Sequence, residues 1–173
     1  MRQRLAIAGR RHVEQHFDWV RIGAQQRTLI RQMTAKPFHL RPATSEDVDQ
    51  IWAIQSTAPE SSQWHREDYL AFDCMVAEES GCLAGFLVSR ETVPGEREIL
   101  NIAVNPEFRR LGVATELIRR ELSEHPGEHF LEVRESNHPA RNLYEHLGFR
   151  EVGVRPGYYE NPPEPGIVMR FFS

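Results

Sequence analysis

The 173-residue sequence predicts a mixed α/β fold (α+β), in which helices flank one mostly antiparallel central sheet. Apolar segments of strand length recur from Phe38 to the C-terminus and alternate with helical patterns. The segments 74–77 and 83–90 are separated only by a turn, as in an antiparallel hairpin. The segments 98–104 and 130–134 instead enclose a helical pattern, which is typical of a parallel crossover. An apolar content of 40% is enough for a single core.

The first 36 residues predict a helical N-terminal extension. Apolar residues recur there at helical spacing, and Asp18 is a plausible N-cap for a second helix. The Lys36-Pro37 step marks the boundary, because the residue before a proline disfavours helix. Residues 1–36 carry eight Lys+Arg and two Asp+Glu, a net charge of +6, whereas residues 37–173 carry 13 and 23, a net charge of −10. The acidic main domain over 37–173 suits a cationic partner, such as an amine or a basic peptide, although solubility alone could explain its charge.

The elements of the main domain follow from local signals. Pro42 ends the first strand, and Thr44 is followed by acidic first-turn residues, as at a helix N-terminus. Pro139 and Gly148 suit the first turn and the C-cap of one helix. The expected order is a strand over 38–42, a helix to about residue 55, a loop over 58–64, a short helix over 66–72, the hairpin, a strand over 98–104, a helix over 115–125, a strand over 130–134, a helix over 139–147, and closing strands over 149–154 and 167–172.

Several classes of site are not expected. A hairpin turn at 78–81 would place Cys82 opposite about Ala77 rather than Cys74, so no disulfide is predicted, and the absence of CxxC and HExxH motifs predicts no metal site. The longest apolar run, Cys82 to Val88, is far shorter than the ~20 residues of a membrane helix. No aromatic-rich RNA-binding segment is present. These features predict a cytoplasmic protein without nucleic-acid or membrane partners, either a monomer or a homodimer.

A predicted anion site lies where the strand ending at Val104 leads into the next helix. The connecting loop carries Arg109, Arg110 and Gly112. The first turn of a helix has backbone N–H groups without intrahelical partners, and the peptide dipoles add partial positive charge there. Gly112 lets an anion approach the backbone, so the loop suits a pyrophosphate. The loop lacks both the Gly-Lys-Ser/Thr of a Walker motif and the GxGxxG of a dinucleotide site.

The spacing Arg109-x-x-Gly112-x-Ala114 resembles the acyl-CoA loop of the GNAT superfamily of N-acetyltransferases. Residues 101–106 resemble the central strand of that family, and 131–137 with 140–149 resemble its second half. The motifs are most similar to the RimI-like branch, the ribosomal-protein-alanine N-acetyltransferases, and the pattern extends from Phe38 to Phe172. Within residues 1–35, the segment 10–19 resembles the C-terminal helices of a retaining glycosyltransferase.

The resemblance implies that acetyl-CoA is the co-substrate. It also implies that the strand at 102–104 splays from its neighbour, so that unpaired backbone groups hold the pantetheine arm and an N–H near Val104 faces the thioester oxygen. Asn137 can cap the following helix, contact the pantetheine, or do both. The residues implied to bind the cofactor are Ile102, Ala103, Val104, Arg109, Arg110, Leu111, Gly112, Val113, Ala114, Thr115 and Asn137.

Glu132 and Tyr144 are the catalytic candidates. Strand alternation places Leu131 and Val133 on one face and Glu132 on the other, where a part-buried carboxylate could accept a proton near neutrality. Tyr144 lies on the apolar stripe of its helix. A solvated strand glutamate and a core tyrosine are the alternative readings. In the resembled branch the matching residues are the general base and the general acid.

The acceptor is predicted to be an α-amine, since its pKa of about 7.7–8.0 leaves it deprotonated more often than a lysine at about 10.4. Trp64, Tyr158 and Tyr159 match aromatic residues that line the peptide groove of the RimI-like branch, although packing alone could explain them. Residues 60–63 and 160–165 depart from that branch, the latter as an acidic, proline-rich loop. A protein N-terminus is therefore the first hypothesis. An amino-sugar or small-amine acetyltransferase, and a non-catalytic acyl-CoA-binding module, are the alternatives.

Overall fold

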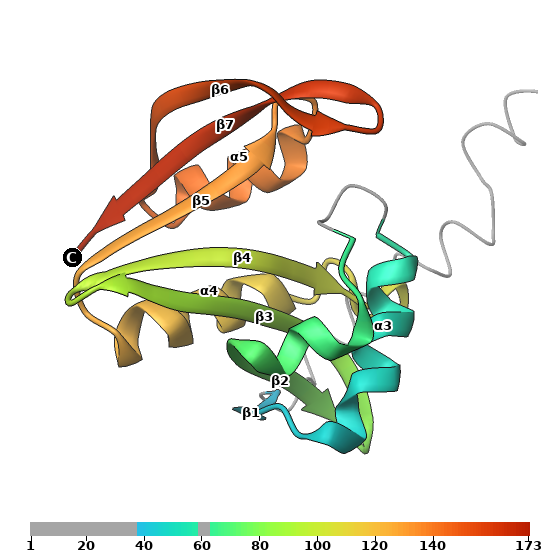
Figure 1. The fold of residues 1–173 in the computed structure, drawn as a ribbon. Coiled ribbons are helices and arrows are strands. Elements are labelled where there is room, and N and C mark those ends of the chain that lie inside the picture. Colours follow the sequence, from blue (N-terminus) through green and yellow to red (C-terminus); the bar gives the residue numbers. More distant parts are fainter. Residues whose placement is uncertain (1–37, 59–62) are drawn as a thin grey trace, which may run out of the picture. The chain divides into compact units, whose positions relative to one another are not determined.

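The computed structural model describes residues 38–58 and 63–173, which form a sheet with helices on both faces (Figure 1). The predicted helical extension over residues 1–36, its resemblance to a glycosyltransferase and residues 59–62 lie outside the described residues. No helix within the described ranges combines the length and the apolar character that crossing a membrane requires.

The sheet has seven strands in the order β1-β2-β3-β4-β5-β7-β6. All neighbouring strands are antiparallel except β4 and β5, which are parallel. This arrangement confirms the predicted mixed sheet with one parallel crossover. The strands are β1 (His39–Pro42), β2 (Asp73–Glu79), β3 (Cys82–Val93), β4 (Glu96–Val104), β5 (Glu128–Arg134), β6 (Arg150–Glu160) and β7 (Pro163–Phe172).

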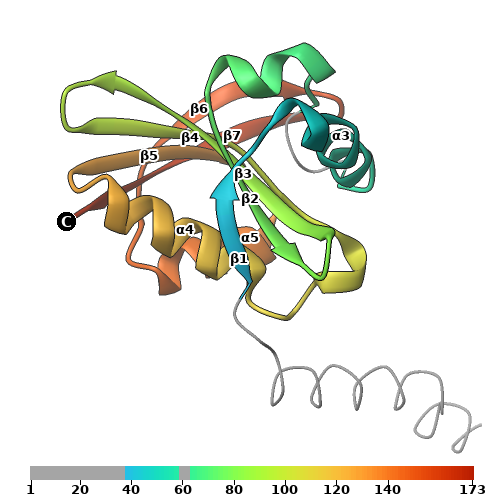
Figure 2. The same cartoon turned by 90° about the horizontal axis from the view of Figure 1, so that it is seen from below.

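Helices cover the two faces of the sheet separately (Figure 2). On one face, α4 (Val113–Glu124) and α5 (His138–His146) bury apolar side chains such as Leu117 against the strands. On the other face lie η1 (Ser45–Asp47), α3 (Val48–Ser56) and η2 (Arg66–Ala71), and a second apolar cluster forms around Ile51 and Phe86. The sheet is therefore buried on both faces near β3 and β4, where strand residues alternate between the two clusters.

Two details differ from the expectations. The first hairpin turns tightly at Ser80-Gly81, both with positive φ, so Cys82 pairs with Glu79 rather than with residue 77. Both thiols are free. The short helix after the 58–64 loop is a 3-10 helix.

The prediction of a loop over residues 160–165 was wrong. β6 and β7 are longer than expected and form a hairpin that pairs Glu160 with Pro163, so Tyr158 and Tyr159 lie within β6 and not after it. Pro163 and Pro165 lie in β7 beyond Gly166, where the pairing of β7 with β5 ends, so their missing N–H groups interrupt no ladder between these two strands.

Candidate active site

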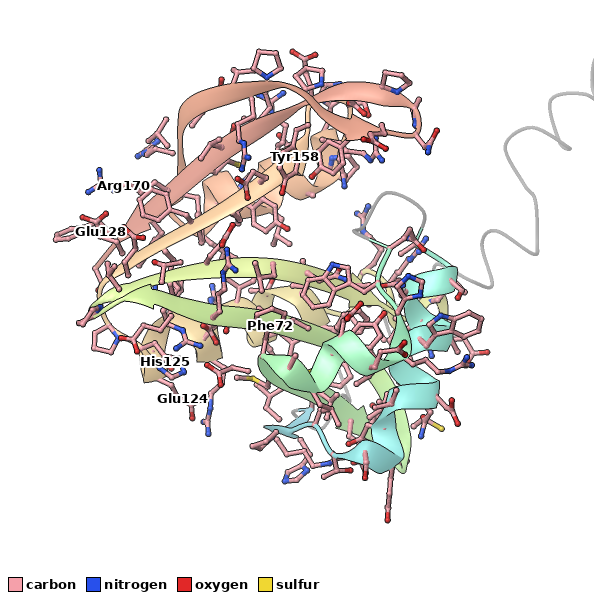
Figure 3. The ribbon with its side chains drawn as sticks, in the orientation of Figure 1. Phe72, Glu124, His125, Glu128, Tyr158 and Arg170 are labelled. Atoms are coloured by element: carbon pink, nitrogen blue, oxygen red, sulfur yellow. The ribbon has the colours of Figure 1, made fainter. Side chains whose placement is uncertain are left out.

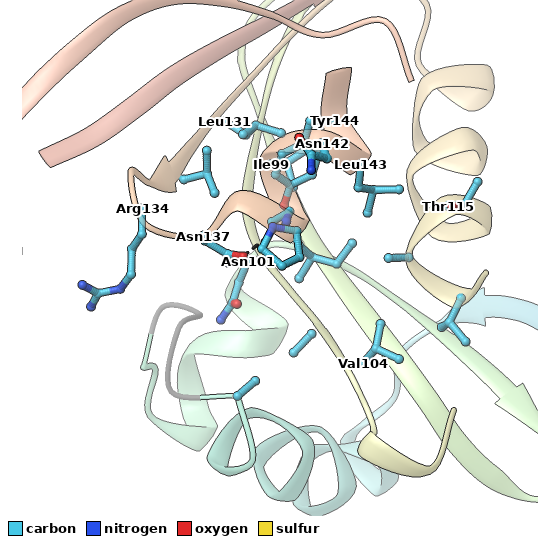
Figure 4. A pocket seen from close by; sticks show the side chains of 18 of the residues that line it. Ile99, Asn101, Val104, Thr115, Leu131, Arg134, Asn137, Asn142, Leu143 and Tyr144 are labelled. Atoms are coloured by element: carbon cyan, nitrogen blue, oxygen red, sulfur yellow. Dashed lines mark hydrogen bonds between the residues drawn. The ribbon is translucent and has the colours of Figure 1, made fainter. Parts of the chain in front are cut away.

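A cleft opens where β4 and β5 part. Their parallel pairing runs from Glu96 and Glu128 to Ile99 and Leu131 and stops there. At the same level β4 carries a bulge: Ile99 pairs with Ser89 on β3, whereas Asn101 pairs with Val88, so Leu100 is the extra residue. Beyond this point β4 no longer pairs with β5, and a cavity of about 820 Å³, hereafter the cleft, lies between them (Figure 4).

The wall of the cleft includes most of the residues that the sequence assigned to the cofactor. Leu111 does not line it and packs instead against the core beneath α4. The lining residues among the candidates are Ile102, Ala103, Val104, Arg109, Arg110, Gly112, Val113, Ala114, Thr115 and Asn137. Strand, loop and helix therefore present one continuous surface to the cleft.

The loop before α4 turns through two residues with positive φ, Arg110 at 65° and Gly112 at 88°. Gly112 is the N-cap of α4, and its carbonyl accepts the N–H of Glu116 at 3.0 Å. The backbone N–H groups of the first turn, at 113–115, therefore have no partner within the helix and lie at the wall of the cleft. This end of the cleft is suited to an anion. The guanidinium of Arg109 donates to the carbonyl of Thr57 at 3.1 Å and links the loop to the end of α3.

Gly85 on β3 allows α4 to approach the sheet here. A Cβ at this position would lie 2.8 Å from the carbonyl oxygen of Ala103 and 2.9 Å from Cγ1 of Val113. Because neither a strand carbonyl nor the packed first turn of a helix can move freely, only glycine fits. In the sequence this glycine lies within the apolar run from Cys82 to Val88 and carries no signal of its own.

Glu132 lies on β5 at the wall of the cleft. The predicted alternation is confirmed: Leu131 and Val133 are buried in the core on one face, and Glu132 is on the other. The side chain of Glu132 is 13% exposed, and its Oε1 accepts a hydrogen bond from Arg155 at 2.7 Å.

Tyr144, on α5, also lines the cleft (Figure 4). It is 6% exposed, and its ring packs against Phe149 with the centroids 5.8 Å apart. Burial raises the pKa of the phenol, with a smaller contribution from Tyr159, so the hydroxyl stays protonated at neutral pH. Asn137 caps the same helix by accepting the N–H of Ala140 at 3.2 Å, which confirms its capping role.

The model of the acetyltransferase (GNAT) family matches residues 40–149, well over half of the chain. The chain belongs to the GNAT acetyltransferase family. It is therefore an enzyme of the acyltransferase class that transfers acetyl to an amino group, and the family uses acetyl-CoA as its co-substrate. No comparison supports the glycosyltransferase resemblance of residues 1–35.

Two curated relatives of this GNAT enzyme carry names that specify the amine they acetylate. An N-alpha-acetyltransferase of Saccharolobus solfataricus is 32% identical over 165 residues, covering 82% of this chain and 98% of that protein. The ribosomal-protein-bS18-alanine N-acetyltransferase of Escherichia coli (strain K12) is 36% identical over 109 residues, covering 60% and 71%. The solved structure of Ard1 from Thermoplasma volcanium superposes with a TM-score of 0.72 at 25% identity, covering 79% of this chain and 97% of that one.

The three aromatic candidates of the GNAT domain occupy different places. Tyr159 lines the cleft, and its hydroxyl donates to the backbone carbonyl of Glu132 at 3.3 Å. Burial raises the pKa of Tyr159 to about 12. Tyr158 is 40% exposed and lies outside the cleft wall, on the β6–β7 side (Figure 3). Trp64 is also outside the wall and packs against the rings of Tyr69 and Phe72.

Three residues near the GNAT cleft carried no signal in the sequence. Gln55 is buried on α3 and holds the backbone of Trp64, donating to its carbonyl at 2.9 Å and accepting its N–H at 3.1 Å. Arg134 stacks on the ring of Tyr159 at 4.1 Å. Arg155 binds Glu132. Each contact joins different elements, so no local pattern could reveal it.

A second cavity, of about 540 Å³, is lined from η2, β1, β2 and the end of α4, with Phe72, Glu124 and His125 in its wall (Figure 3). It shares no lining residue with the cleft. The two cavities are thus separate features of the GNAT domain.

Proposed function

We propose that this enzyme acetylates the α-amino group of a protein or peptide N-terminus, with Glu132 as base and Tyr144 as acid. The observation that carries the proposal is the presence of a carboxylate and a buried phenol in the wall of one cleft, which ends at an anion-binding helix N-terminus. The relatives named N-alpha-acetyltransferase and ribosomal-protein-alanine N-acetyltransferase support the choice of acceptor.

The cleft suits acetyl-CoA in size and in chemistry. The unpartnered N–H groups at the start of α4 fit the negative charge of a pyrophosphate. The unpaired edge of β4 at 102–104 offers backbone donors and acceptors to an amide-rich arm. When bound, acetyl-CoA supplies an acetyl group whose C–S bond breaks as a C–N bond to the acceptor forms.

Glu132 serves to remove the proton of the attacking amine. Its Oε2 accepts no hydrogen bond from the described residues, so that oxygen is available to an amine, directly or through a water. An α-amine suits this base because its ordinary pKa of about 7.7–8.0 is far lower than that of lysine. The proton therefore leaves the acceptor at neutral pH with little cost.

Tyr144 serves to return a proton to the leaving sulfur. A donor must be protonated at working pH, and burial keeps the phenol in that form. Transfer to a thiolate is uphill in water, where the thiol and phenol have pKa values of about 8.5 and 10. In a buried site the thiolate is destabilised as well, which offsets the effect of burial on the pKa of the phenol.

The deciding experiment measures CoA release with acetyl-CoA and a panel of peptides that differ in their first residue, together with glucosamine and a free lysine. We expect turnover on a peptide that begins with Ala. Glu132→Gln should lower kcat/KM at neutral pH by about 100-fold and should recover part of it at high pH, where the amine is already neutral. Glu135→Gln is the matched control, since Glu135 follows on the same segment, is exposed and lies outside the cleft wall.

Each other outcome has a defined meaning. Turnover on glucosamine and on none of the peptides would show that the acceptor is an amino sugar and not a peptide. Binding of CoA without turnover on any amine would contradict catalysis. Equal loss in Glu132→Gln and Glu135→Gln would remove the special role of Glu132.

A further inference from the structure

The carboxylate of Glu132 has one cationic partner, and that partner is itself held in place. Nη1 of Arg155 on β6 lies 2.7 Å from Oε1 of Glu132. No other described residue donates a hydrogen bond to this carboxylate. The side chain of Glu132 is 13% exposed and that of Arg155 is 57% exposed. The pair therefore lies at the edge of the cleft, with the arginine on the solvent side. Hydrogen bonding to Glu132 raises the pKa of Arg155.

A bulge in β6 supports the guanidinium from behind. Arg155 pairs with Gly166 on β7, and the next pair is Tyr159 with Glu164, so three residues of β6 oppose one of β7. The bulge brings the ring of Tyr158 under the guanidinium of Arg155, at 4.5 Å from the ring centroid. This cation–π contact limits the positions that the long arginine side chain can take.

Gly166 makes room for that ring. A Cβ at position 166 would lie 2.9 Å from Cδ1 and 3.1 Å from Cβ of Tyr158. Gly166, Tyr158, Arg155 and Glu132 therefore form a continuous series of contacts from β7 through β6 to β5.

The other charged groups around Glu132 are committed elsewhere. Arg90 on β3 binds Glu98 on β4 through two hydrogen bonds, at 2.9 and 2.6 Å. Arg134 on β5 binds Glu164 on β7 and stacks on Tyr159. Tyr158 and Tyr159 are neutral at physiological pH, because burial raises the pKa of each phenol. Among the described residues, Arg155 is thus the cation in contact with Glu132.

We propose that Arg155 is a positioning residue, which holds the carboxylate of Glu132 ionised and with Oε2 free for the acceptor amine. The inference rests on the proposed role of Glu132 as base. An opposite charge in direct contact favours the carboxylate over the carboxylic acid. The pair therefore presents the base to the acceptor amine as a carboxylate whose Oε2 is bound by no described residue.

The test is the titration of the Glu132 carboxyl by NMR in the full chain at low ionic strength, with its signal assigned by its loss in Glu132→Gln. Arg155→Met keeps an apolar stem over Tyr158 and removes the charge, whereas Arg155→Lys keeps the charge. In Arg155→Met we expect the titration midpoint to rise by about half to one pH unit, as the loss of a largely exposed ion pair implies. Arg155→Lys should keep most of the wild-type midpoint, and the acidic limb of kcat/KM should move with the midpoint in each variant.

An unmoved midpoint in Arg155→Met would overturn the inference, and so would a rise of equal size in Arg155→Lys. A shifted midpoint together with full activity of Glu132→Gln would support the contact and overturn the proposed base instead. Thermal unfolding separates a local effect from a general one: a purely structural role for Arg155 predicts a lower Tm in both variants with no change in the midpoint.

Discussion

Tyr144 shows how one residue can serve packing and chemistry together. Its ring belongs to the core cluster with Phe149, yet it also lines the cleft. The two roles are compatible because a tyrosine has an apolar body and a polar tip. Its counterpart on the opposite face, Tyr69, is fully buried among apolar residues, and its hydroxyl has no hydrogen-bond partner among residues 38–58 and 63–173.

Replacing Tyr144 by Phe should lower kcat by about 100-fold, because the leaving sulfur loses its proton donor while the ring still packs. Since burial raises the pKa of Tyr144, the wild-type rate should show no alkaline loss from this group up to about pH 10. The pH profile of CoA release measures both effects. Tyr69→Phe is the matched control and should leave kcat unchanged, because it removes only an unpaired buried hydroxyl outside the cleft. A Tyr144→Phe enzyme with the wild-type kcat would rule out Tyr144 as the general acid.

At the level of elements, the cleft depends on contacts that tie helices and loops to β4. The bulge at Leu100 shifts the register of β4 against β3 at the level where the pairing of β4 with β5 ends. Gln55 on α3 reaches this bulge, since its Oε1 accepts a hydrogen bond from Nδ2 of Asn101 at 3.2 Å as well as the N–H of Trp64. One buried amide thus fixes both the segment that carries Trp64 and the side of β4 next to the cleft.

Replacing Gln55 by Leu should reduce the free energy of unfolding by about 2 kcal/mol, because part-buried backbone groups of Trp64 lose their partner. We expect KM for the peptide acceptor to rise severalfold, because Gln55 holds the segment of Trp64, a candidate for acceptor binding. The change in kcat should be smaller, because Glu132 and Tyr144 are not in contact with Gln55. Steady-state kinetics and denaturant unfolding check the two parts. Gln50→Leu, on the same helix with a single contact to the N–H of Leu83, should leave KM unchanged. Equal KM values in the two variants would argue against a role for Trp64 in acceptor binding.

For the domain as a whole, a charge cluster joins the first strand, the first helical turn and β2. Arg41 binds both carboxylate oxygens of Asp47 and also contacts Glu78. The side chain of Asp47 is 6% exposed. Hydrogen bonding from Arg41 lowers the pKa of Asp47 to about 2 from its ordinary value of 3.8, so the folded state binds this proton less readily than the unfolded chain.

The stability that Asp47 contributes is therefore complete above about pH 4 and is lost as the pH falls toward 2. Asp47→Asn should reduce the free energy of unfolding by about 2 kcal/mol at pH 7 and flatten its decrease between pH 4 and 2. Denaturant unfolding at a series of pH values measures this change. Asp49→Asn is the control, because that carboxylate is 86% exposed and its pair with Arg66 should contribute less than about 1 kcal/mol. An unchanged acid transition in Asp47→Asn would show that other groups dominate it.

The sequence alone determined the order of the elements and the kind of ligand, an anion, that suits one end of the cleft. Strand alternation around Glu132, the capping signals at Asn137 and Gly148, and the loop from Arg109 to Thr115 are local features, and local patterns are set by backbone sterics and by the periods of strand and helix. These predicted the sheet, its one parallel crossover and a helix N-terminus suited to an anion. The extent of β6 and β7 was underestimated, because Pro163 and Pro165 were interpreted as loop signals but lie in β7 beyond the end of its pairing with β5.

Only the tertiary structure decided which side chains meet. Arg155 and Glu132 are 23 residues apart, and Gln55 and Asn101 are 46 apart. Their contacts depend on the register of β6 against β7 and on the bulges in β4 and β6, which no sequence period specifies. The same is true of Gly85 and Gly166, whose lack of a side chain matters because of neighbours brought close by the fold. Periodicity fixes the face on which a residue lies, whereas strand register and packing fix its partner.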